Sequence, residues 1–307
     1  MKWFRGRARS NSESAPVKPG PVFDLHTHLL PGLDDGASSW EEAVEFLVRA
    51  WRSGTRAVVL TPHYLAGVYQ PSPEEIRAAT RKLARRLVGL VPVWSGAEGP
   101  AVGTAEAAAG LDGIAGDGPG REELPPARPH REEPVGQSGP LRLLVGCEAH
   151  LDPALPELVG AGRVLTLGDL GTHLLVELPM GEIPRWADEV LFSLAVAGVT
   201  PVLAHPERCV GVQRRPEWLE AAVERGALVQ LNGASLVGAY GAQVARVAAR
   251  LVRRGRAHFL GSDAHGADRG EVLARAVAVA ERLAGVEVAG RLAWGNAAEL
   301  LVRAVSW

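Results

Sequence analysis

The sequence Asp24-Leu25-His26-Thr27-His28 sets two histidines at the end of an apolar run, Pro21 to Leu25. Similar apolar runs, each followed closely by His, Asp or Glu, are Ala57 to Leu60, Leu141 to Val145, Val199 to Leu203 and His258 to Leu260. Short, continuously apolar runs are typical of buried parallel strands, whose carboxyl ends meet at one rim. The pattern therefore predicts that polar side chains from distant segments converge at one rim of a parallel sheet.

The segments between these runs have helical spacing. In Ser38 to Arg52, the residues Ala43, Phe46, Leu47 and Ala50 share one face, and Ser38 or Ser39 with Glu41 or Glu42 supplies an N-terminal cap. Further helices are expected in Ser72 to Leu90, Ile183 to Ala197, Pro216 to Arg225, Gln243 to Arg253 and Gly270 to Ala284. Such alternation favours a parallel sheet, open or closed, and one α/β barrel of roughly 250 residues would account for most of the chain.

Composition narrows the class of protein. The formal net charge of the 307 residues is -2, which argues against nucleic acid as a partner. Two cysteines cannot form a multi-disulfide framework, so a reducing compartment, the cytoplasm, is expected. Residues 1–20 contain no apolar stretch able to span a bilayer, so direct membrane insertion is not expected.

The chain divides into three parts. Residues 1–20 are interpreted as a flexible tail and 21–307 as one catalytic domain. An insertion at about 96–139 interrupts this domain and is rich in Gly, Ala, Pro, Glu and Arg, with almost no large apolar residues. Such a composition offers too little burial to offset the entropy of ordering, so we interpret the insertion as disordered, with a substrate-docking arm as the alternative.

Several metal-ligand donors follow the apolar runs. Alternate residues of a strand share a face, so His26 and His28 can bind one ion, although a lone His-x-His also occurs without metal. The further donors are Asp34, Asp35, His63, Glu148, Glu177, His205, Asp263 and His265. Unpaired, half-buried charges at strand ends would be costly, so the set as a whole predicts a metal site. It suffices for two or three ions, and its nitrogen and oxygen donors suit Mn, Fe or Zn better than Ca.

Particular motifs resemble a known family. They are His26-Thr27-His28-Leu29-Leu30-Pro31-Gly32-Leu33-Asp34-Asp35-Gly36, Thr61-Pro62-His63, Gly146-Cys147-Glu148, Glu177-Leu178-Pro179, His205-Pro206-Glu207-Arg208, Gln230-Leu231-Asn232 and Ser262-Asp263-Ala264-His265. In these motifs the sequence is similar to the polymerase and histidinol phosphatase (PHP) superfamily. Within it, the first and fifth motifs resemble most the bacterial manganese-dependent tyrosine phosphatases of capsule and exopolysaccharide operons.

The resemblance implies a distorted seven-stranded (β/α) barrel with three metals at the carboxyl ends of its strands. The implied ligands are His26, His28, Glu148 and Asp263 for the first metal, Glu148, Glu177 and His205 for the second, and Asp35, His63 and His265 for the third. Sequence alone does not separate Asp35 from its neighbour Asp34.

The resemblance also implies a mechanism, in which a hydroxide bridging two metals attacks phosphorus. Arg208 is the first candidate for binding the phosphate oxygens and Arg269 the second, while His265 could protonate the leaving oxygen. The expected substrate is a phosphotyrosyl protein, such as a bacterial tyrosine kinase that controls polysaccharide export. The alternatives are a histidinol phosphatase or other small-molecule phosphomonoesterase, a nucleic-acid hydrolase, and a regulator without catalysis.

One motif suggests a different chemistry. Cys209 and Arg215 have the Cys-x5-Arg spacing of cysteine-dependent tyrosine phosphatases. The five residues between them contain one glycine, whereas an anion-binding loop around a thiolate is rich in glycine. We therefore interpret Cys209 as a packed side chain.

Overall fold

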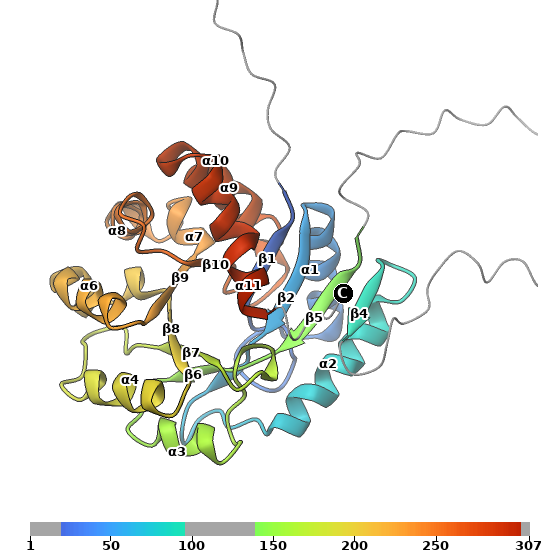
Figure 1. The fold of residues 1–307 in the computed structure, drawn as a ribbon. Helices are drawn as coiled ribbons and strands as arrows, with labels where there is room; N and C mark the ends of the chain where they lie inside the picture. Colours follow the sequence, from blue (N-terminus) through green and yellow to red (C-terminus); the bar gives the residue numbers. More distant parts are fainter. Residues whose placement is uncertain (1–19, 96–138, 302–307) are drawn as a thin grey trace, which may run out of the picture.

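The described part of the chain forms a curled parallel sheet surrounded by helices (Figure 1). The computed structural model describes residues 20–95 and 139–301. The predicted tail, 1–20, and the predicted insertion, 96–139, therefore lie outside the described residues, apart from Gly20 and Gly139. Among the described residues, no helix has the length and apolar character that crossing a bilayer requires.

The order of elements is the alternation that the sequence predicts. The strands are β1 Val22–Thr27, β2 Thr55–Leu60, β3 His63–Tyr64, β4 Val93–Ser95, β5 Leu141–Val145, β6 Glu148–His150, β7 His173–Glu177, β8 Thr200–Ala204, β9 Leu228–Asn232 and β10 Phe259–Gly261. The helices are α1 Trp40–Arg52, α2 Pro73–Leu87, α3 Leu155–Gly160, α4 Ala187–Val196, α5 Val210–Arg214, α6 Pro216–Glu224, α7 Gly233–Leu236, α8 Gly241–Arg253, α9 Val272–Ala284, α10 Val286–Gly290 and α11 Asn296–Leu301. Short helical turns are η1 Leu167–Asp169, η2 Pro206–Arg208, η3 Ala267–Arg269 and η4 Arg291–Gly295.

The sheet closes into a barrel. The hydrogen-bonded orders β1-β2-β5-β4 and β10-β9-β8-β7-β6-β3 are joined because β2 continues into β3, and β5 into β6, after two-residue interruptions. One interruption contains Pro62, which has no N–H to donate to a strand neighbour. β10 returns to β1, where Asp263 N–H donates to the carbonyl of His26 at 2.9 Å. When β2 with β3 and β5 with β6 are each counted as one strand, the described residues form a barrel of seven strands, and β4 pairs with β5 outside it. This confirms the predicted distorted (β/α) barrel.

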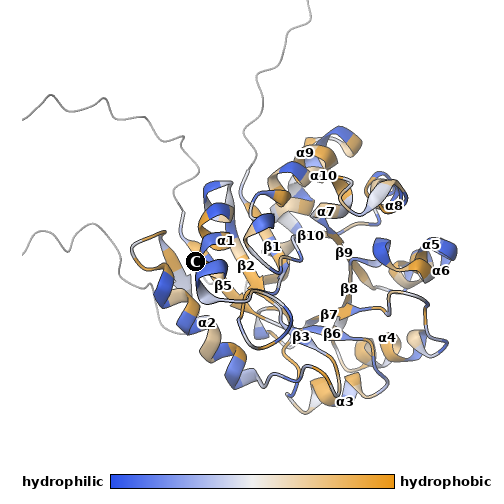
Figure 2. Cartoon of the chain, turned by 180° about the vertical axis from the view of Figure 1, so that it is seen from behind, coloured by the Kyte–Doolittle hydropathy of each residue, from blue (hydrophilic) through white to orange (hydrophobic). Residues whose placement is uncertain are grey.

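Local sequence explains how the helices begin and which face they bury. At α1, the Ser39 hydroxyl accepts from Glu42 N–H at 3.1 Å, which decides between the two candidate cap serines. At α2, Ser72 and Glu75 form a capping box. In Figure 2 the helices combine hydrophobic and hydrophilic residues, whereas the central strands β2, β7 and β8 are mainly hydrophobic.

Two hydrophobic clusters lie on the two sides of the barrel wall. The larger fills the layer between strands and helices. The smaller contains Phe23, Leu25, Ala57, Val59, Leu144, Leu167, Leu175, Val202, Ala204, Phe259, Ala297 and Leu301, so that α11 packs against the strands in this second cluster. The barrel is a packed core, and its function must lie at an end of the barrel.

Candidate metal centre

The carboxylate of Glu148, at the start of β6, is the centre of the site. Its Oε2 lies 3.0 Å from His26 Nε2, 3.1 Å from His28 Nε2 and 3.0 Å from His63 Nδ1, and its Oε1 lies 3.0 Å from His205 Nε2. The side chain is fully buried, yet neither oxygen has a well-formed hydrogen bond among the described residues. Because four ring nitrogens converge on a buried carboxylate, the donor set fits a divalent cation.

The cluster contains donors for more than one ion. Three groups of donor atoms each lie within 4.8 Å of one another: His26, His28, Glu148 and Asp263; His63, Glu148 and Glu177; and His28, His63 and His265. The first group is the set that the resemblance implies for the first metal. His205 joins the second through Glu148, and its Nε2 lies 3.9 Å from Glu177 Oε1. The structure thus assembles a candidate multi-metal site from residues of distant segments.

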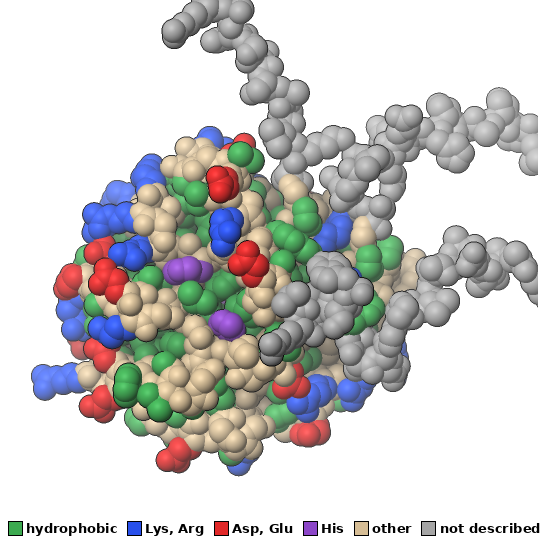
Figure 3. Space-filling model, in the orientation of Figure 1, with side chains coloured by type: hydrophobic (Ala, Val, Ile, Leu, Met, Phe, Trp, Pro, Cys, Tyr) green, Lys and Arg blue, Asp and Glu red, His purple; other side chains and the backbone are tan. Residues whose placement is uncertain are grey.

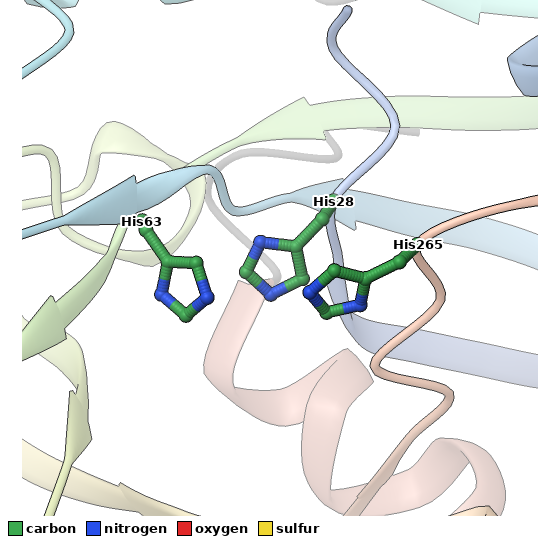
Figure 4. A group of neighbouring side chains, drawn as sticks. All are labelled: His28, His63 and His265. Carbon is green, nitrogen blue, oxygen red and sulfur yellow. The ribbon is translucent and has the colours of Figure 1, made fainter. Parts of the chain in front are cut away.

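The third group is shown in Figure 4, where the His28 imidazole lies between those of His63 and His265. The ring centroid of His28 is 4.3 Å from each of the other two. Asp35 extends toward the same place, with its Oδ1 3.7 Å from His63 Nε2 and 3.8 Å from His265 Nε2. The predicted donors of the third metal are therefore neighbours, and whether they bind metal stays a prediction.

Asp34 and Asp35, which sequence could not separate, differ in environment. Asp34 Oδ2 accepts from His28 Nδ1 at 2.7 Å and from His63 N–H at 2.9 Å, while Oδ1 accepts from Gly36 N–H at 3.0 Å. The side chain of Asp34 is 1% exposed and that of Asp35 is 54% exposed. Asp34 thus orients His28, whereas Asp35 is more than half exposed, and metal binding by Asp35 stays a prediction.

Side chains behind the donors fix the ring orientations. Gln230, in the middle of β9, orients its amide by donating to the Leu231 carbonyl, so its Oε1 accepts from His26 Nδ1 at 3.1 Å. A proton on Nδ1 leaves the Nε2 lone pair of His26 directed at Glu148 and His28, as metal binding requires. Asn232 Nδ2 donates to Asp263 Oδ2 at 2.9 Å.

Sequence reasoning gave no role to Gln230, Asn232 or His150. His150 Nδ1 lies 3.3 Å from Glu177 Oε2. A usable signal existed for all three, because Gln230 interrupts an apolar run, Asn232 ends it, and His150 follows Glu148 by two residues. No motif or apolar run in the sequence pointed to Tyr240, which lies close to both arginines.

The backbone is strained at two donors. His205 and Asp263 have φ values of +31° and +51°, a region that residues other than glycine rarely adopt. A nearby glycine is also required, because a Cβ at Gly36 would lie 2.1 Å from the His28 carbonyl oxygen. Strain of this kind persists where the surroundings over-determine the geometry, as they do around a preorganised site.

The cluster is strongly coupled electrostatically. Burial opposes ionisation of Glu148, but His26, His205 and His28 hold the pKa of its carboxyl well below the ordinary value. Burial likewise opposes the charged form of His205, but contact with Glu148 raises its pKa to about 9. The pKa of His28 is also raised, through Asp263 and Asp34. The metal-free cluster thus holds protons on imidazoles where cations would otherwise balance the carboxylates.

Both candidate phosphate-binding arginines lie beside Asp263. Arg208 Nη1 donates to Asp263 Oδ2 at 2.5 Å, and Arg269 Nη1 donates to the Asp263 backbone carbonyl at 2.7 Å. They come from η2 after β8 and η3 after β10, so they converge from separate segments. The structure brings the two together at the edge of the histidine cluster, and phosphate binding by either stays a prediction.

Cys209 lacks the exposure and the lowered pKa of a thiolate nucleophile, although it lies at the N-terminus of α5. The residue is 1% exposed, its Sγ donates to the Pro179 carbonyl at 3.2 Å, and burial raises the pKa of its thiol. Arg215 reaches the Ile183 carbonyl at 3.4 Å. The interpretation of Cys209 as a packed side chain agrees with this environment.

A parallel α/β barrel whose strand ends bring imidazole and carboxylate groups together is the architecture of a metal-dependent hydrolase. Residues 22–93 and 130–302 match the model of one family, described as "Capsular polysaccharide synthesis, CpsB/CapC". The chain belongs to this family, which confirms the resemblance found in the sequence.

Relatives and a solved structure agree with this assignment. The tyrosine-protein phosphatase YwqE of Bacillus subtilis is 29% identical over 80% of this chain and 77% of its own length. The tyrosine-protein phosphatase CpsB of Streptococcus agalactiae is 22% identical over 91% and 98%. A structure from work on YwqE and on CpsB of Streptococcus pneumoniae, "unique metal-dependent tyrosine phosphatases", superposes with a TM-score of 0.70. It is 29% identical and covers 92% of this chain and 95% of its own.

Proposed function

We propose that this protein, a metal-dependent phosphatase of the CpsB/CapC type, hydrolyses phosphotyrosine in proteins and uses water activated by bound metal ions. The observation that carries the proposal is the cluster around Glu148, in a chain similar over most of its length to tyrosine phosphatases. The proposed substrate is a cytoplasmic phosphotyrosyl protein, with a tyrosine kinase of capsular or exopolysaccharide synthesis as the leading candidate.

The residues proposed to hold the ions are those of the three donor groups, with Glu148 shared between two of them. His205 is proposed for the second ion and Asp35 for the third. When bound, such ions would ionise a water at neutral pH and neutralise charge on the phosphate. We propose manganese as the natural metal, and the same donors would accept iron or zinc.

Arg208 and Arg269 are proposed to bind the non-bridging phosphate oxygens. A guanidinium is a planar fork of N–H donors, and each of these two commits one of its Nη atoms to Asp263. The other N–H groups can serve a phosphate held at the rim. Because Asn232 also donates to Asp263 Oδ2, that carboxylate stays oriented when an arginine turns toward substrate.

We propose that metal binding is the main role of His265. Its Nδ1 lies 3.0 Å from the Asp263 carbonyl, an acceptor, so the proton is on Nδ1 and the Nε2 lone pair faces the side of Asp35. In an imidazole with this tautomer and an ion at Nε2, the remaining proton is on Nδ1 and is donated to the Asp263 carbonyl, so it does not serve the leaving phenolate. Solvent water is therefore the better proton source for that oxygen, and the general-acid role predicted for His265 is the weaker of its two.

The competing function is hydrolysis of a small phosphomonoester such as histidinol phosphate. Manganese-loaded protein should be assayed on a phosphotyrosyl peptide, the same peptide with phosphoserine, and histidinol phosphate. We expect kcat/KM for the phosphotyrosyl peptide to exceed the other two by about 10² or more, since a phenolate is the better leaving group and the aryl ring adds contact. Preference for histidinol phosphate would refute the proposal.

A further inference from the structure

Tyr240 lies beneath both candidate phosphate-binding arginines. It precedes α8, and its ring is half-buried. The guanidinium carbon of Arg208 lies 4.5 Å from the ring centroid and that of Arg269 lies 5.8 Å from it. A guanidinium within about 6 Å of an aromatic face is attracted by the negative potential of that face. One ring thus contacts two cations that arrive from separate loops.

Both arginines lie near the same carboxylate, that of Asp263, so a second attractive partner would stabilise the pair. Arg208 contacts Asp263 Oδ2, while Arg269 binds the backbone carbonyl and stays 4.0 Å from the carboxylate. The other carboxylate oxygen of Asp263 faces the cluster, 3.5 Å from His28 Nε2. A neutral ring offsets part of the repulsion between two guanidinium groups without adding a charge that would repel phosphate.

Contact with a ring also affects which atoms of the arginines remain available. A ring face accepts no conventional hydrogen bond, and a guanidinium that lies flat on it keeps its N–H donors in its own plane, pointing outward. A carboxylate in the place of Tyr240 would occupy those donors. The ring therefore holds the arginines in position and leaves their N–H edges available for oxygens of an anion.

The hydroxyl of Tyr240 contributes little to this arrangement. Asn232 Nδ2 lies 3.5 Å from the hydroxyl oxygen, whereas the same nitrogen donates to Asp263 Oδ2 at 2.9 Å. The first distance is at the limit of a hydrogen bond, so the face of the ring is the part of Tyr240 that matters.

We propose that Tyr240 is a positioning residue that holds Arg208 and Arg269 together as a two-armed clamp for the phosphate of the substrate. This inference rests on the proposed phosphatase function and deepens it. In this proposal Tyr240 touches neither the metals nor the substrate, and it acts through the two arginines.

The test compares Tyr240→Phe, which keeps the ring, with Tyr240→Leu, which removes the aromatic face. Binding of inorganic phosphate to the manganese-loaded proteins is measured by calorimetry, and KM and kcat with a phosphotyrosyl peptide. Tyr240→Leu should weaken phosphate binding and raise KM by about tenfold, as expected for losing two cation–π contacts. Tyr240→Phe should stay within about twofold. Tyr240→Met serves as a second variant if the leucine protein does not fold.

Trp40→Leu is the matched control. The ring of Trp40 also lies beneath two cations, with Lys82 Nζ at 4.5 Å and Arg86 Cζ at 5.3 Å, but these lie on α2. Its loss should lower stability and leave phosphate binding unchanged. In an Arg208→Ala, Arg269→Ala background, Tyr240→Leu should have almost no further effect, since its partners are gone.

Two outcomes overturn the inference: wild-type affinity for phosphate in Tyr240→Leu, or an undiminished effect of that change in the background without arginines. Failure of the phosphatase proposal gives a different result. The wild-type protein would then bind phosphate, and Tyr240→Leu would weaken that binding, with no turnover of the phosphotyrosyl peptide by either protein.

Discussion

The two ends of the barrel both carry histidines, but among the described residues only the carboxyl end has the surroundings of a metal site. At the carboxyl end, imidazoles of distant segments converge on the buried carboxylate of Glu148. At the amino end, His173 and His258 line a cavity of about 500 Å³. There, His258 Nδ1 accepts from Val229 N–H at 3.0 Å, and Glu299 faces Arg291 at 3.7 Å.

The difference between the two ends shows that a cavity lined by histidines is not sufficient for a metal site. Burial lowers the pKa of both His173 and His258, so these rings are neutral packing groups. Histidines at the carboxyl end instead share carboxylates: His28 and His205 have raised pKa values, whereas burial lowers the pKa values of His63 and His265. Carboxylates close to the histidines, rather than the volume of a cavity, distinguish the end of the barrel that fits a metal site.

On the face shown in Figure 3, positive and negative side chains are interspersed along α6 and α8, where Arg254 pairs with Glu220.

The largest effect is expected from Glu148→Gln. The amide keeps the size of the side chain but removes the charge that two ions would share, so metal content should fall and kcat/KM should drop by roughly 10³ or more. Elemental analysis and turnover of a phosphotyrosyl peptide measure both. His258→Gln, at the other end, is the control and should retain its metal. Full metal content in Glu148→Gln would contradict the assignment of the metal site to the carboxyl end of the barrel.

A smaller effect, about 10² in kcat/KM, is expected from Arg208→Ala, because a forked, charge-assisted contact with phosphate is lost. Arg208→Lys should recover part of the activity, since an ammonium cannot copy the fork. Metal content should stay unchanged, because Asn232 continues to hold Asp263. The control is Arg215→Ala, in the same region of the chain. Wild-type turnover by Arg208→Ala would show that groups other than Arg208 bind the phosphate.

One histidine from each end, His205 and His258, should affect stability in opposite pH ranges. The pKa of His205 is raised from 6.5 to about 9, so its stabilisation of the metal-free protein is complete below pH 6.5 and is lost as pH rises through 9. The shift corresponds to at most about 3 kcal/mol. His258 has a lowered pKa, so its contribution is lost only below pH 6.5.

Denaturant unfolding at pH 6 and pH 9, with and without manganese under nitrogen, tests this prediction. Stabilisation by the metal should grow with pH, because the donor imidazoles must be neutral to bind it. If metal stabilises the protein equally at both pH values, the proposed protonation of the metal-free cluster is wrong. The His205→Gln variant is the control and should lose the part of the pH dependence that His205 contributes, while His28, whose pKa is also raised, keeps its own part.

The smallest effect is expected from Cys209→Ser. The thiol is buried against the Pro179 carbonyl and has a raised pKa, so turnover should change by no more than about twofold. A loss of roughly 10³, the scale of removing a nucleophile, would revive the cysteine mechanism.

Much of the fold follows from sequence, because apolar runs and helical spacing report burial directly. The two-residue interruptions that divide β2 from β3 and β5 from β6 did not follow, since they depend on how the barrel closes. For the site, the donors at strand ends were identifiable because parallel strands deliver their ends to one rim. Asp34 and Asp35 were not separable, because adjacent loop residues differ only in which one turns toward His28. Tyr240 lies in a turn, where spacing carries no information about contacts.

The most direct test of the central claim is phosphate release from a phosphotyrosyl peptide by one preparation before chelation, after chelation and after reloading with manganese, with metal content measured at each step. We expect activity to disappear with the metal and to return with two or three bound ions per chain. Full activity in metal-free protein would contradict the claim that the cluster around Glu148 is the catalytic centre.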